Sequence, residues 1–227
     1  MCARYEVDAS VDEILREIEF FRLQPPPRRE DLTWAKQIRP YGKGPVLVRE
    51  GLKLMQFALV PSWSKEKRVK FSTYNARLDG VLEKPTWRRP FSEKHCLVPV
   101  SNFIEPIYQG EFAGNWVRFQ EPTKKLLFAA GIWDEWRSPV DGEVIESFAI
   151  LTHDPLKPVE EMGHERSPLF LDEVGCGEWL ALGEGPSDRV KRSPLQWVDF
   201  LRSHRLTPAI AALKDEPMKA GWEKRKT

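Results

Sequence analysis

The chain has 227 residues, with 35 lysines and arginines against 34 aspartates and glutamates and a net charge of +1. This balance excludes a uniformly basic nucleic-acid binder but is compatible with a local basic patch. No apolar run reaches membrane-spanning length and no signal-peptide pattern occurs, so we expect no membrane association. Cys2, Cys96 and Cys176 lack metal-type spacing, which argues against a disulfide scaffold and a zinc site and fits a reducing compartment.

The first quarter of the chain predicts one helix and two strands. Apolar side chains recur at helical spacing over residues 10–21, and Ser10 with Glu13 forms the sequence pattern of a capping box. Residues 46–49 and 52–60 are strand-like, and the Glu50-Gly51 pair between them predicts a tight turn.

The middle of the chain is rich in predicted strands. Residues 96–104 form an apolar run that predicts a buried strand, with a bulge or a sheet edge at Pro99. Residues 115–119 and 126–133 are expected to be the two arms of a hairpin. Residues 144–152 have strong β-propensity and predict a further strand.

The C-terminal part predicts helices over 172–182 and 194–204, the second with Ser193 as its N-cap and Pro194 at its first position. Strands in the middle and helices at the ends predict an α+β fold, with a mainly antiparallel β core (barrel- or sandwich-like) and peripheral helices. No linker or repeat divides the chain. We therefore expect a single domain over residues 1–227, with its part 172–227 helical.

The sequence opens Met1-Cys2-Ala3-Arg4-Tyr5. If the initiator methionine is removed, Cys2 carries a free α-amine beside its thiol, and their reference pKa values are roughly 8 and about 8.5. Both groups are then partly nucleophilic near neutrality. Such an aminothiol converts an aldehyde into an imine and then into a five-membered thiazolidine. The alternative is an ordinary small residue in a loose terminus.

Three segments with polar residues follow that can carry chemistry. Asn75 and Arg77 come after a basic, aromatic loop, where the amide can orient a reacting group and the guanidinium can bind a phosphate. Glu105 ends an apolar run, and partial desolvation raises the pKa of a carboxyl and suits it to proton transfer. His164 lies in a loop and can move protons near neutral pH. The alternatives are a turn cap, a solvated strand end and an incidental histidine.

Two segments combine tryptophan with cations. Trp63 precedes the lysine-rich stretch 65–70, and Trp87 is followed by Arg88 and Arg89. Base stacking together with phosphate neutralisation binds single strands without reading their sequence. The alternative is a solvated charge run whose tryptophans face inward.

In chain order, these features resemble the SRAP family (SOS response-associated peptidase), whose members process abasic sites in DNA. The resemblance spans residues 1–171, and the chain departs from the family pattern at Ala3, where glycine is usual, and at Pro106, where tryptophan is usual. The matching segments are Met1-Cys2-Ala3-Arg4-Tyr5, Trp63 after Val60-Pro61, Asn75-Ala76-Arg77, Cys96-Leu97-Val98-Pro99 leading to Glu105, Ala130-Gly131-Ile132-Trp133, and His164-Glu165-Arg166-Ser167-Pro168.

The resemblance implies that Cys2 captures the ring-opened aldehyde of an abasic site in single-stranded DNA as a thiazolidine crosslink, which protects the lesion. Asn75 would hold the amine and the sugar, Glu105 would shuttle protons, and His164 would assist ring opening or reversal. No cofactor or metal is implied. The partner would be single-stranded DNA containing abasic sites, bound by a monomeric, cytoplasmic protein (nucleoid-associated in a bacterium). The DNA-binding side chains would be Arg4, Trp63, Arg77, Arg88 and Arg166.

Three other interpretations stay open. Cys2 can instead attack an amide, which would make the chain a cysteine-type peptidase or autopeptidase. A non-catalytic single-strand binder that recognises damage by stacking would retain its binding after Cys2→Ala. The last interpretation is a globular scaffold that matches the family by chance.

Overall fold

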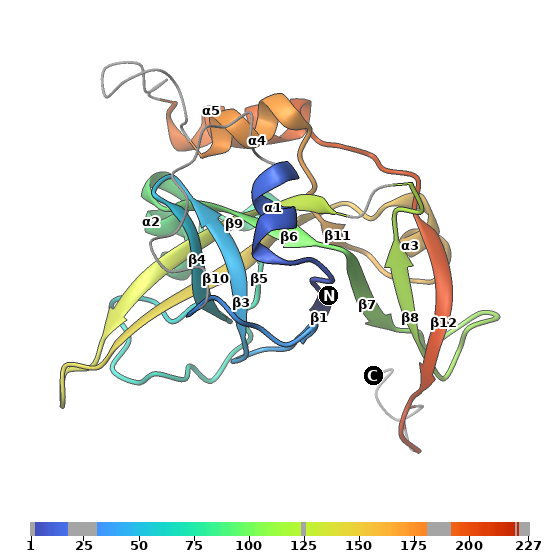
Figure 1. Cartoon of the computed structure of the whole chain (residues 1–227). Coiled ribbons are helices and arrows are strands. Elements are labelled where there is room, and N and C mark those ends of the chain that lie inside the picture. The colour runs from blue at the N-terminus through green and yellow to red at the C-terminus, as the bar shows by residue number, and fades with distance from the viewer. Residues whose placement is uncertain (1–2, 18–30, 124–125, 181–191, 221, 223–227) are drawn as a thin grey trace.

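The computed structural model describes residues 3–17, 31–123, 126–180, 192–220 and 222 (Figure 1). Two β-sheets form its centre, and short helices lie around them. The predicted α+β class with a mainly antiparallel, barrel-like core is confirmed. Among the helices in these ranges, none has the length and apolar character needed to cross a bilayer.

The larger sheet closes into a barrel, because each of five strands pairs with the next and the last pairs with the first. Within this ring the β10–β4 pairing is parallel and the others are antiparallel. The ring order is β10 (Val144–His153), β4 (Gly51–Phe57), β3 (Lys43–Val48), β6 (His95–Val100) and β9 (Leu127–Arg137). Two short strands extend the C-terminal part of β10: β5 (Asn75–Arg77) and β11 (Ser167–Pro168).

The barrel closes at β9, which pairs with β6 through its first half and with β10 through its second half. Gly131 lies where the two pairings overlap, opposite Cys96 on one side and Ile150 on the other. A Cβ at this position would lie 2.8 Å from Cys96 Sγ and 3.2 Å from the carbonyl oxygen of Ala149. Glycine is therefore required here because neighbouring strands approach too closely for a side chain.

The second sheet is antiparallel throughout and stands beside the barrel. Its central strand β7 follows β6 directly in the chain, so the chain changes sheet at Ser101, whose backbone N–H donates to the Glu6 carbonyl at 2.8 Å. In spatial order the strands are β12 (Ala211–Pro217), β8 (Asn115–Gln120), β7 (Asn102–Pro106), β1 (Arg4–Glu6) and β2 (Gln37–Ile38).

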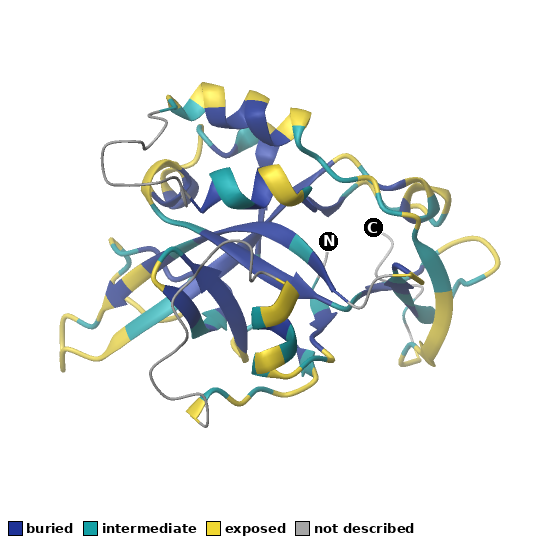
Figure 2. Ribbon diagram, turned by 45° about the horizontal axis from the view of Figure 1, so that its top comes forward, coloured by how far each residue is buried: buried dark blue, intermediate teal, exposed yellow. Residues whose placement is uncertain are grey.

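The helices are short and amphipathic, with buried faces toward the sheets and exposed faces outward (Figure 2). Ser10 and Glu13 form the predicted capping box, and Ser193 caps its helix as predicted, in a capping box with Gln196. The helices are α1 (Val11–Glu17), α2 (Pro85–Glu93), α3 (Lys157–Glu161), α4 (Glu173–Trp179) and α5 (Pro194–Ser203), with a 3₁₀ turn, η3, at Leu78–Gly80.

Several predicted elements need correction. The hairpin predicted from 115–119 and 126–133 is wrong, because β8 pairs with β7 and β12 whereas β9 belongs to the barrel. The strand predicted over 96–104 is two strands in different sheets, and the β6–β9 pairing runs through Pro99 without a bulge.

The ends of the chain differ from expectation in two further ways. The helix predicted over 10–21 is present from Val11 to Glu17, and its residues 18–21 lie outside the described ranges. The part after residue 171, expected to be helical, contains α4 and α5 but also β12, which completes the edge of the second sheet beside β8. Residues 211–217 place their polar side chains consecutively, at 214–216, so no apolar alternation marks this edge strand in the sequence.

Trp179 attaches α4 to the barrel and gives a test of this packing. Its buried indole N–H donates to the carbonyl oxygens of Cys96 and Gly131 at 3.0 and 3.1 Å. Trp179→Phe leaves both acceptors without that donor, and we expect a loss of about 1–3 kcal/mol in the free energy of unfolding, measured in urea. The exposed Trp63→Phe is the matched control and should change stability by less than about 0.5 kcal/mol. Equal effects of the two substitutions would contradict this packing.

Candidate functional site

Strand β1, near the first described residue, pairs with the strand that carries Glu105, the predicted proton donor. Cys2 lies outside the described residues, but β1 starts two positions later and pairs antiparallel with β7. Arg4 stands opposite Ile104, and Tyr5 stands opposite Phe103. Arg4, the first residue of β1, therefore lies opposite the residue that directly precedes Glu105 in β7.

Glu105 is fully buried in the middle of the second sheet, where it pairs with Val117 of β8. Burial disfavours the charged carboxylate and raises the pKa of Glu105 to about 7. A carboxyl with such a pKa exchanges protons readily at neutral pH, as a general acid or base must. The desolvation that the apolar run of the sequence predicted is therefore present.

His164 meets the same strand from a different loop. Helix α3 ends at Glu161, and Gly163 turns the chain two residues later with a φ of +83°. The backbone N–H of His164 donates to the Val159 carbonyl at 3.2 Å. The ring Nε2 lies 3.0 Å from the carbonyl oxygen of Pro106. Because a carbonyl only accepts, this contact fixes the Nε2–H tautomer and leaves the lone pair on Nδ1. Burial lowers the pKa of His164 to about 4, so the ring is neutral at pH 7.

The same loop connects the second sheet with the barrel. Two residues after His164, the Arg166 guanidinium donates to Asp79 at 2.7 Å, and Asp79 lies in the turn that directly follows β5. The loop therefore spans from the end of β7 to the end of β5. This loop thus contacts both the end of the strand that carries Glu105 and the turn after the strand that carries Asn75, although the two strands belong to different sheets.

An aromatic chain supports this arrangement from inside. The rings of Tyr5 and Phe57 are 5.2 Å apart, edge to face, and the rings of Phe57 and Tyr74 are 5.9 Å apart. Tyr5 belongs to β1, and Tyr74 immediately precedes Asn75. Such ring pairs contribute about 0.5–1.5 kcal/mol each beyond their burial. These ring contacts fix the start of β5 relative to β1.

Asn75 opens onto a pocket of about 240 Å³. Asn75 itself is nearly buried, whereas Arg77 on the same strand and Lys84 before α2 are exposed. Aromatic surfaces beside two cations suit a nucleotide, whose base stacks and whose phosphate pairs. The lining residues are Phe71, Ser72, Tyr74, Asn75, Arg77, Lys84, Thr86 and Trp87.

Trp63 projects from an anchored loop. The backbone N–H of Ser62 donates to Asp134 at 2.8 Å, and the Ser64 carbonyl accepts from the Trp136 indole at 2.7 Å. Trp63 lies between these two anchors and is 58% exposed. An exposed ring on a fixed backbone is a suitable stacking surface, in agreement with the functional interpretation rather than with an inward tryptophan.

Two other predicted DNA-binding side chains have partners within the protein. The Arg4 guanidinium lies 3.7 Å from the centre of the Trp116 ring and pairs with Glu216 at 2.7 Å. Arg88 donates to the carbonyl oxygens of Leu82 and Glu83 at 2.9 and 3.4 Å. Glu216 is half exposed, and such ion pairs are weak and exchangeable.

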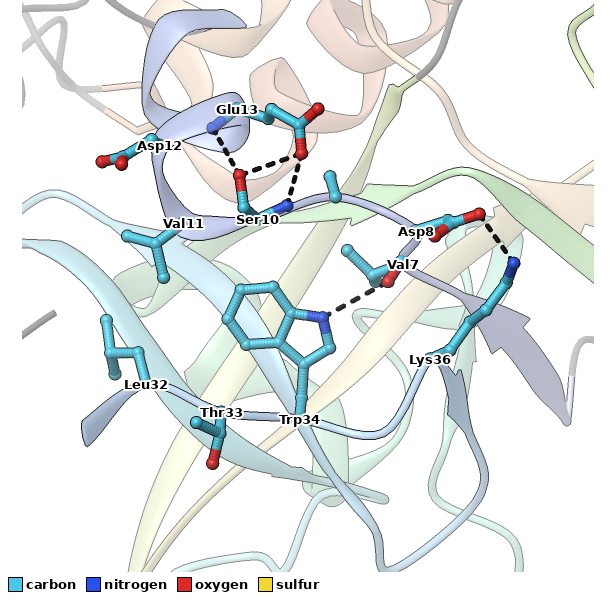
Figure 3. Close-up of a pocket in the computed structure, with 11 residues that line it drawn as sticks. Val7, Asp8, Ser10, Val11, Asp12, Glu13, Leu32, Thr33, Trp34 and Lys36 are labelled. Carbon is cyan, nitrogen blue, oxygen red and sulfur yellow. Dashed lines mark hydrogen bonds and ion pairs between the residues drawn. The ribbon is translucent and has the colours of Figure 1, made fainter. Parts of the chain in front are cut away.

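A larger, open pocket of about 640 Å³ follows β1 (Figure 3). Trp34 donates through its indole N–H to the Val7 carbonyl at 3.3 Å, and Lys36 pairs with Asp8 at 2.6 Å. None of the side chains predicted to be functional lines it. These two contacts fix the segment that follows β1 and so help to hold the register at Arg4.

Sequence reasoning singled out candidate residues and missed part of their surroundings. Lys84 and Tyr74 line the Asn75 pocket but were not singled out, because their proximity to Asn75 depends on tertiary contacts that no local motif encodes. Across the described ranges, no group of three or more His, Cys, Asp or Glu residues is placed to hold a metal ion.

Comparisons with known proteins show the family of this chain. The family model described as SOS response associated peptidase (SRAP) matches residues 1–211. The chain is 26% identical over 194 residues to the abasic site processing protein YoqW of Bacillus subtilis, covering 79% of this chain and 80% of that protein. It is 30% identical over 161 residues to the abasic site processing protein HMCES of Pongo abelii, covering 57% of this chain and 45% of that protein.

Two solved structures share the fold. A protein from Bacteroides thetaiotaomicron matches with a TM-score of 0.71 at 18% identity, covering 100% of both chains. A protein from Bordetella bronchiseptica matches with a TM-score of 0.70 at 20% identity, covering 95% of this chain and 100% of that one.

Glu105 gives a pH-dependent prediction. Below the ordinary pKa of 4.5 the carboxyl is protonated in both states, so its burial costs no ionisation energy. Between that value and about 7 only the unfolded state ionises, so stability falls as pH rises; above about 7 the full cost remains. Glu105→Gln removes this ionisation cost. The free energy of unfolding of Glu105→Gln minus that of the parent should therefore rise between pH 4.5 and 7, by on the order of 3 kcal/mol, and then level off.

Urea unfolding at several pH values measures this difference. Glu135→Gln, on an exposed position of β9, controls for the removal of a carboxyl in general. A parent-to-Gln difference that stays constant from pH 4.5 to 8 would show that Glu105 is not desolvated in the folded protein.

Proposed function

Because this chain belongs to the SRAP family, we propose that it processes abasic sites in DNA, using Cys2 to form a covalent thiazolidine crosslink with the lesion in single-stranded DNA. The observation that carries the proposal is the β1–β7 register. It sets Arg4, two positions after Cys2 in the sequence, opposite the neighbour of Glu105, a buried carboxyl whose pKa is raised to about 7 by burial. The proposal requires this carboxyl to serve as the acid for the Cys2 amine, and a general acid must lie within hydrogen-bond reach of the group it serves.

The reaction begins with the α-amine of Cys2, once Met1 is removed. Its lone pair attacks the aldehyde carbon of the ring-opened sugar and gives a carbinolamine. Glu105, protonated in part of the molecules at neutral pH, donates a proton to the departing hydroxyl, and water leaves as the imine forms. The Cys2 sulfur then adds to the imine carbon and its proton moves to the nitrogen, which closes the thiazolidine. The sum is aldehyde plus aminothiol giving thiazolidine plus one water.

Asn75 and His164 have positioning and proton-transfer roles in this proposal. The Asn75 amide offers both a donor and an acceptor to the amine and the sugar. His164 is neutral at pH 7, and its Nε2–H is occupied by Pro106, so Nδ1 is the atom that accepts a proton from the sugar hydroxyl during ring opening. A neutral imidazole is required for that step because an imidazolium has no free lone pair.

The DNA path in this proposal runs over the barrel end next to Asn75. Arg77 and Lys84 neutralise phosphates, and Trp63 stacks on a base beside the lesion. Arg4, Arg88 and Arg166 exchange their present partners for phosphates when the strand binds. This exchange costs little free energy where the partner carboxylate is solvent-exposed, as Glu216 and Asp79 are.

The first test concerns Cys2. Cys2→Ala removes the sulfur and therefore should abolish a denaturant-resistant complex with an abasic oligonucleotide on a denaturing gel, while weak non-covalent binding remains. The buried Cys96→Ala, remote from the start of β1 in sequence, is the matched thiol control and should still crosslink. Equal crosslink yields from Cys2→Ala and the parent would exclude the mechanism, and Cys2-dependent peptide cleavage without capture would support a peptidase instead.

A second test separates proton transfer from binding. Glu105→Gln should slow capture by about 100-fold or more, the usual contribution of a general acid, with little change in the affinity for undamaged single-stranded DNA. Single-turnover capture rates and fluorescence anisotropy measure the two quantities. An unchanged capture rate would remove Glu105 from the mechanism.

A third test concerns Arg77. Arg77→Ala should weaken non-covalent DNA binding and reduce the slope of log affinity against log salt by about 0.7, because one phosphate contact and its counterion release are lost. Arg137→Ala removes an exposed arginine from β9, outside the Asn75 pocket, and should leave the slope nearly unchanged. Identical slopes for both variants would show that Arg77 makes no phosphate contact.

A further inference from the structure

A second cationic pocket lies on the other side of the β5–β10 end. It has a volume of about 180 Å³ and is formed where β10, the turn after β5, the loop before β11 and the end of α5 meet. Its polar lining consists of three arginines, one histidine and two aspartates. The lining residues are Leu78, Asp79, His153, Asp154, Arg166, Leu169, Arg202 and Arg205.

The pocket contains buried polar atoms that no part of the described chain satisfies. His153 is only 7% exposed, and its Nε2 is buried without a hydrogen-bond partner among the described residues. The same is true of the Nε atoms of Arg166 and Arg205. A buried polar group without a partner typically costs about 1–3 kcal/mol, so several together indicate that a ligand completes them.

The backbone holds Arg205 in place. Arg205 forms an antiparallel bridge with Leu171, and the adjacent Leu206 donates its backbone N–H to the Phe170 carbonyl at 2.9 Å. One guanidinium N–H donates to the backbone carbonyl of Asp154 at 3.3 Å. The side chain therefore enters the pocket from a paired segment rather than from a free end, which lowers the entropy lost on binding.

The acidic groups around the pocket are mostly in solvent. Asp79 pairs with Arg166 at 2.7 Å and is 51% exposed, and Asp154 lies 3.9 Å from the same guanidinium and is 85% exposed. Arg202 pairs with Asp199 at 3.8 Å, and both are exposed. Solvent screens these carboxylates, whereas the Arg166 side chain is only 16% exposed, so the buried face of the pocket is positive.

This pocket continues the proposed DNA path. Leu78 and Asp79 directly follow Arg77, and Thr152, the neighbour of His153, stands opposite Arg77 in the β5–β10 pairing. We propose that the pocket binds a phosphodiester group of the same single strand, one contact beyond Arg77, through Arg205, Arg166 and Nε2–H of His153, with Arg202 at its rim. This proposal rests on the proposed function and extends the binding site into the C-terminal part of the chain.

The chemistry of the donors fits that occupant. Arginine presents a planar fork of N–H groups that matches the oxygens of a phosphate. Burial and the neighbouring Arg205 lower the pKa of His153 to about 4, so the ring is neutral and donates one N–H without adding a charge. The phosphate oxygens can accept from the three N–H groups, on His153, Arg166 and Arg205, that the described part of the pocket leaves without partners.

The test compares Arg205→Gln with Arg137→Gln, the latter on an exposed position of β9, both in the Cys2→Ala background so that binding stays non-covalent. Fluorescence anisotropy measures affinity for an abasic oligonucleotide across a salt series. Arg205→Gln should bind about tenfold more weakly at low salt and lose about 0.7 from the salt slope, whereas Arg137→Gln should match the background. Equal slopes for the two variants would overturn the proposal.

Shortened oligonucleotides then identify the source of the phosphate. Removing nucleotides from the side of the lesion that reaches the pocket should weaken binding in the background protein and have no further effect in Arg205→Gln. A truncation penalty that is the same in both proteins overturns the strand assignment. So does stabilisation of the parent by inorganic phosphate, absent in Arg205→Gln, without any truncation effect, because the occupant would then be a free anion.

Two controls keep the outcomes distinct. Arg202→Gln, at the exposed rim, should reduce the slope of log affinity against log salt by less than Arg205→Gln does. Thermal unfolding verifies that each variant is folded. The crosslink itself is measured with Cys2 restored. A parent that fails to crosslink contradicts the proposed function, whereas a parent that crosslinks while Arg205→Gln retains the full salt slope and truncation penalty contradicts only this pocket.

Discussion

The site depends on one short antiparallel pairing. Three residues of β1 lie between β2 and β7, and the match of Arg4 with Ile104 sets the position of β1 relative to Glu105. After the C-terminal end of β1, Val7 and Asp8 are held by Trp34 and Lys36. Within β1, the ring of Tyr5 packs against Phe57 in the core. A one-residue slip would exchange the faces of β1 and move Tyr5 out of the core, so the register is strongly specified.

Two opposite consequences of burial then prepare the chemistry. Desolvation raises the pKa of Glu105 to about 7 and lowers the pKa of His164 to about 4, so the carboxyl can carry a proton at neutral pH and the imidazole can accept one. The contact of His164 with Pro106 joins the two groups to the same strand. Cations lie outside this buried centre, where they can meet phosphates without charging the centre itself.

The sequence predicted local features better than it predicted contacts between distant segments. The α+β class, the capping boxes and the desolvation of Glu105 were predictable because apolar periodicity and local motifs encode them. The partners of β8 and β9 were not, because pairing between distant strands depends on the closed barrel and not on the short loop between them. Arg205 was missed for a related reason. Its approach to Arg166 depends on a backbone bridge at Leu171, which leaves no local signature.

The central claim is that the amine and the sulfur of Cys2 together capture the aldehyde of an abasic site. Intact mass spectrometry of the protein, alone and after mixing with an abasic oligonucleotide, tests it most directly. The account predicts a chain that lacks Met1 and an adduct whose mass equals that chain plus the oligonucleotide minus one water. A protein that keeps Met1, or one that lacks it and shows no adduct after denaturation, would contradict the account.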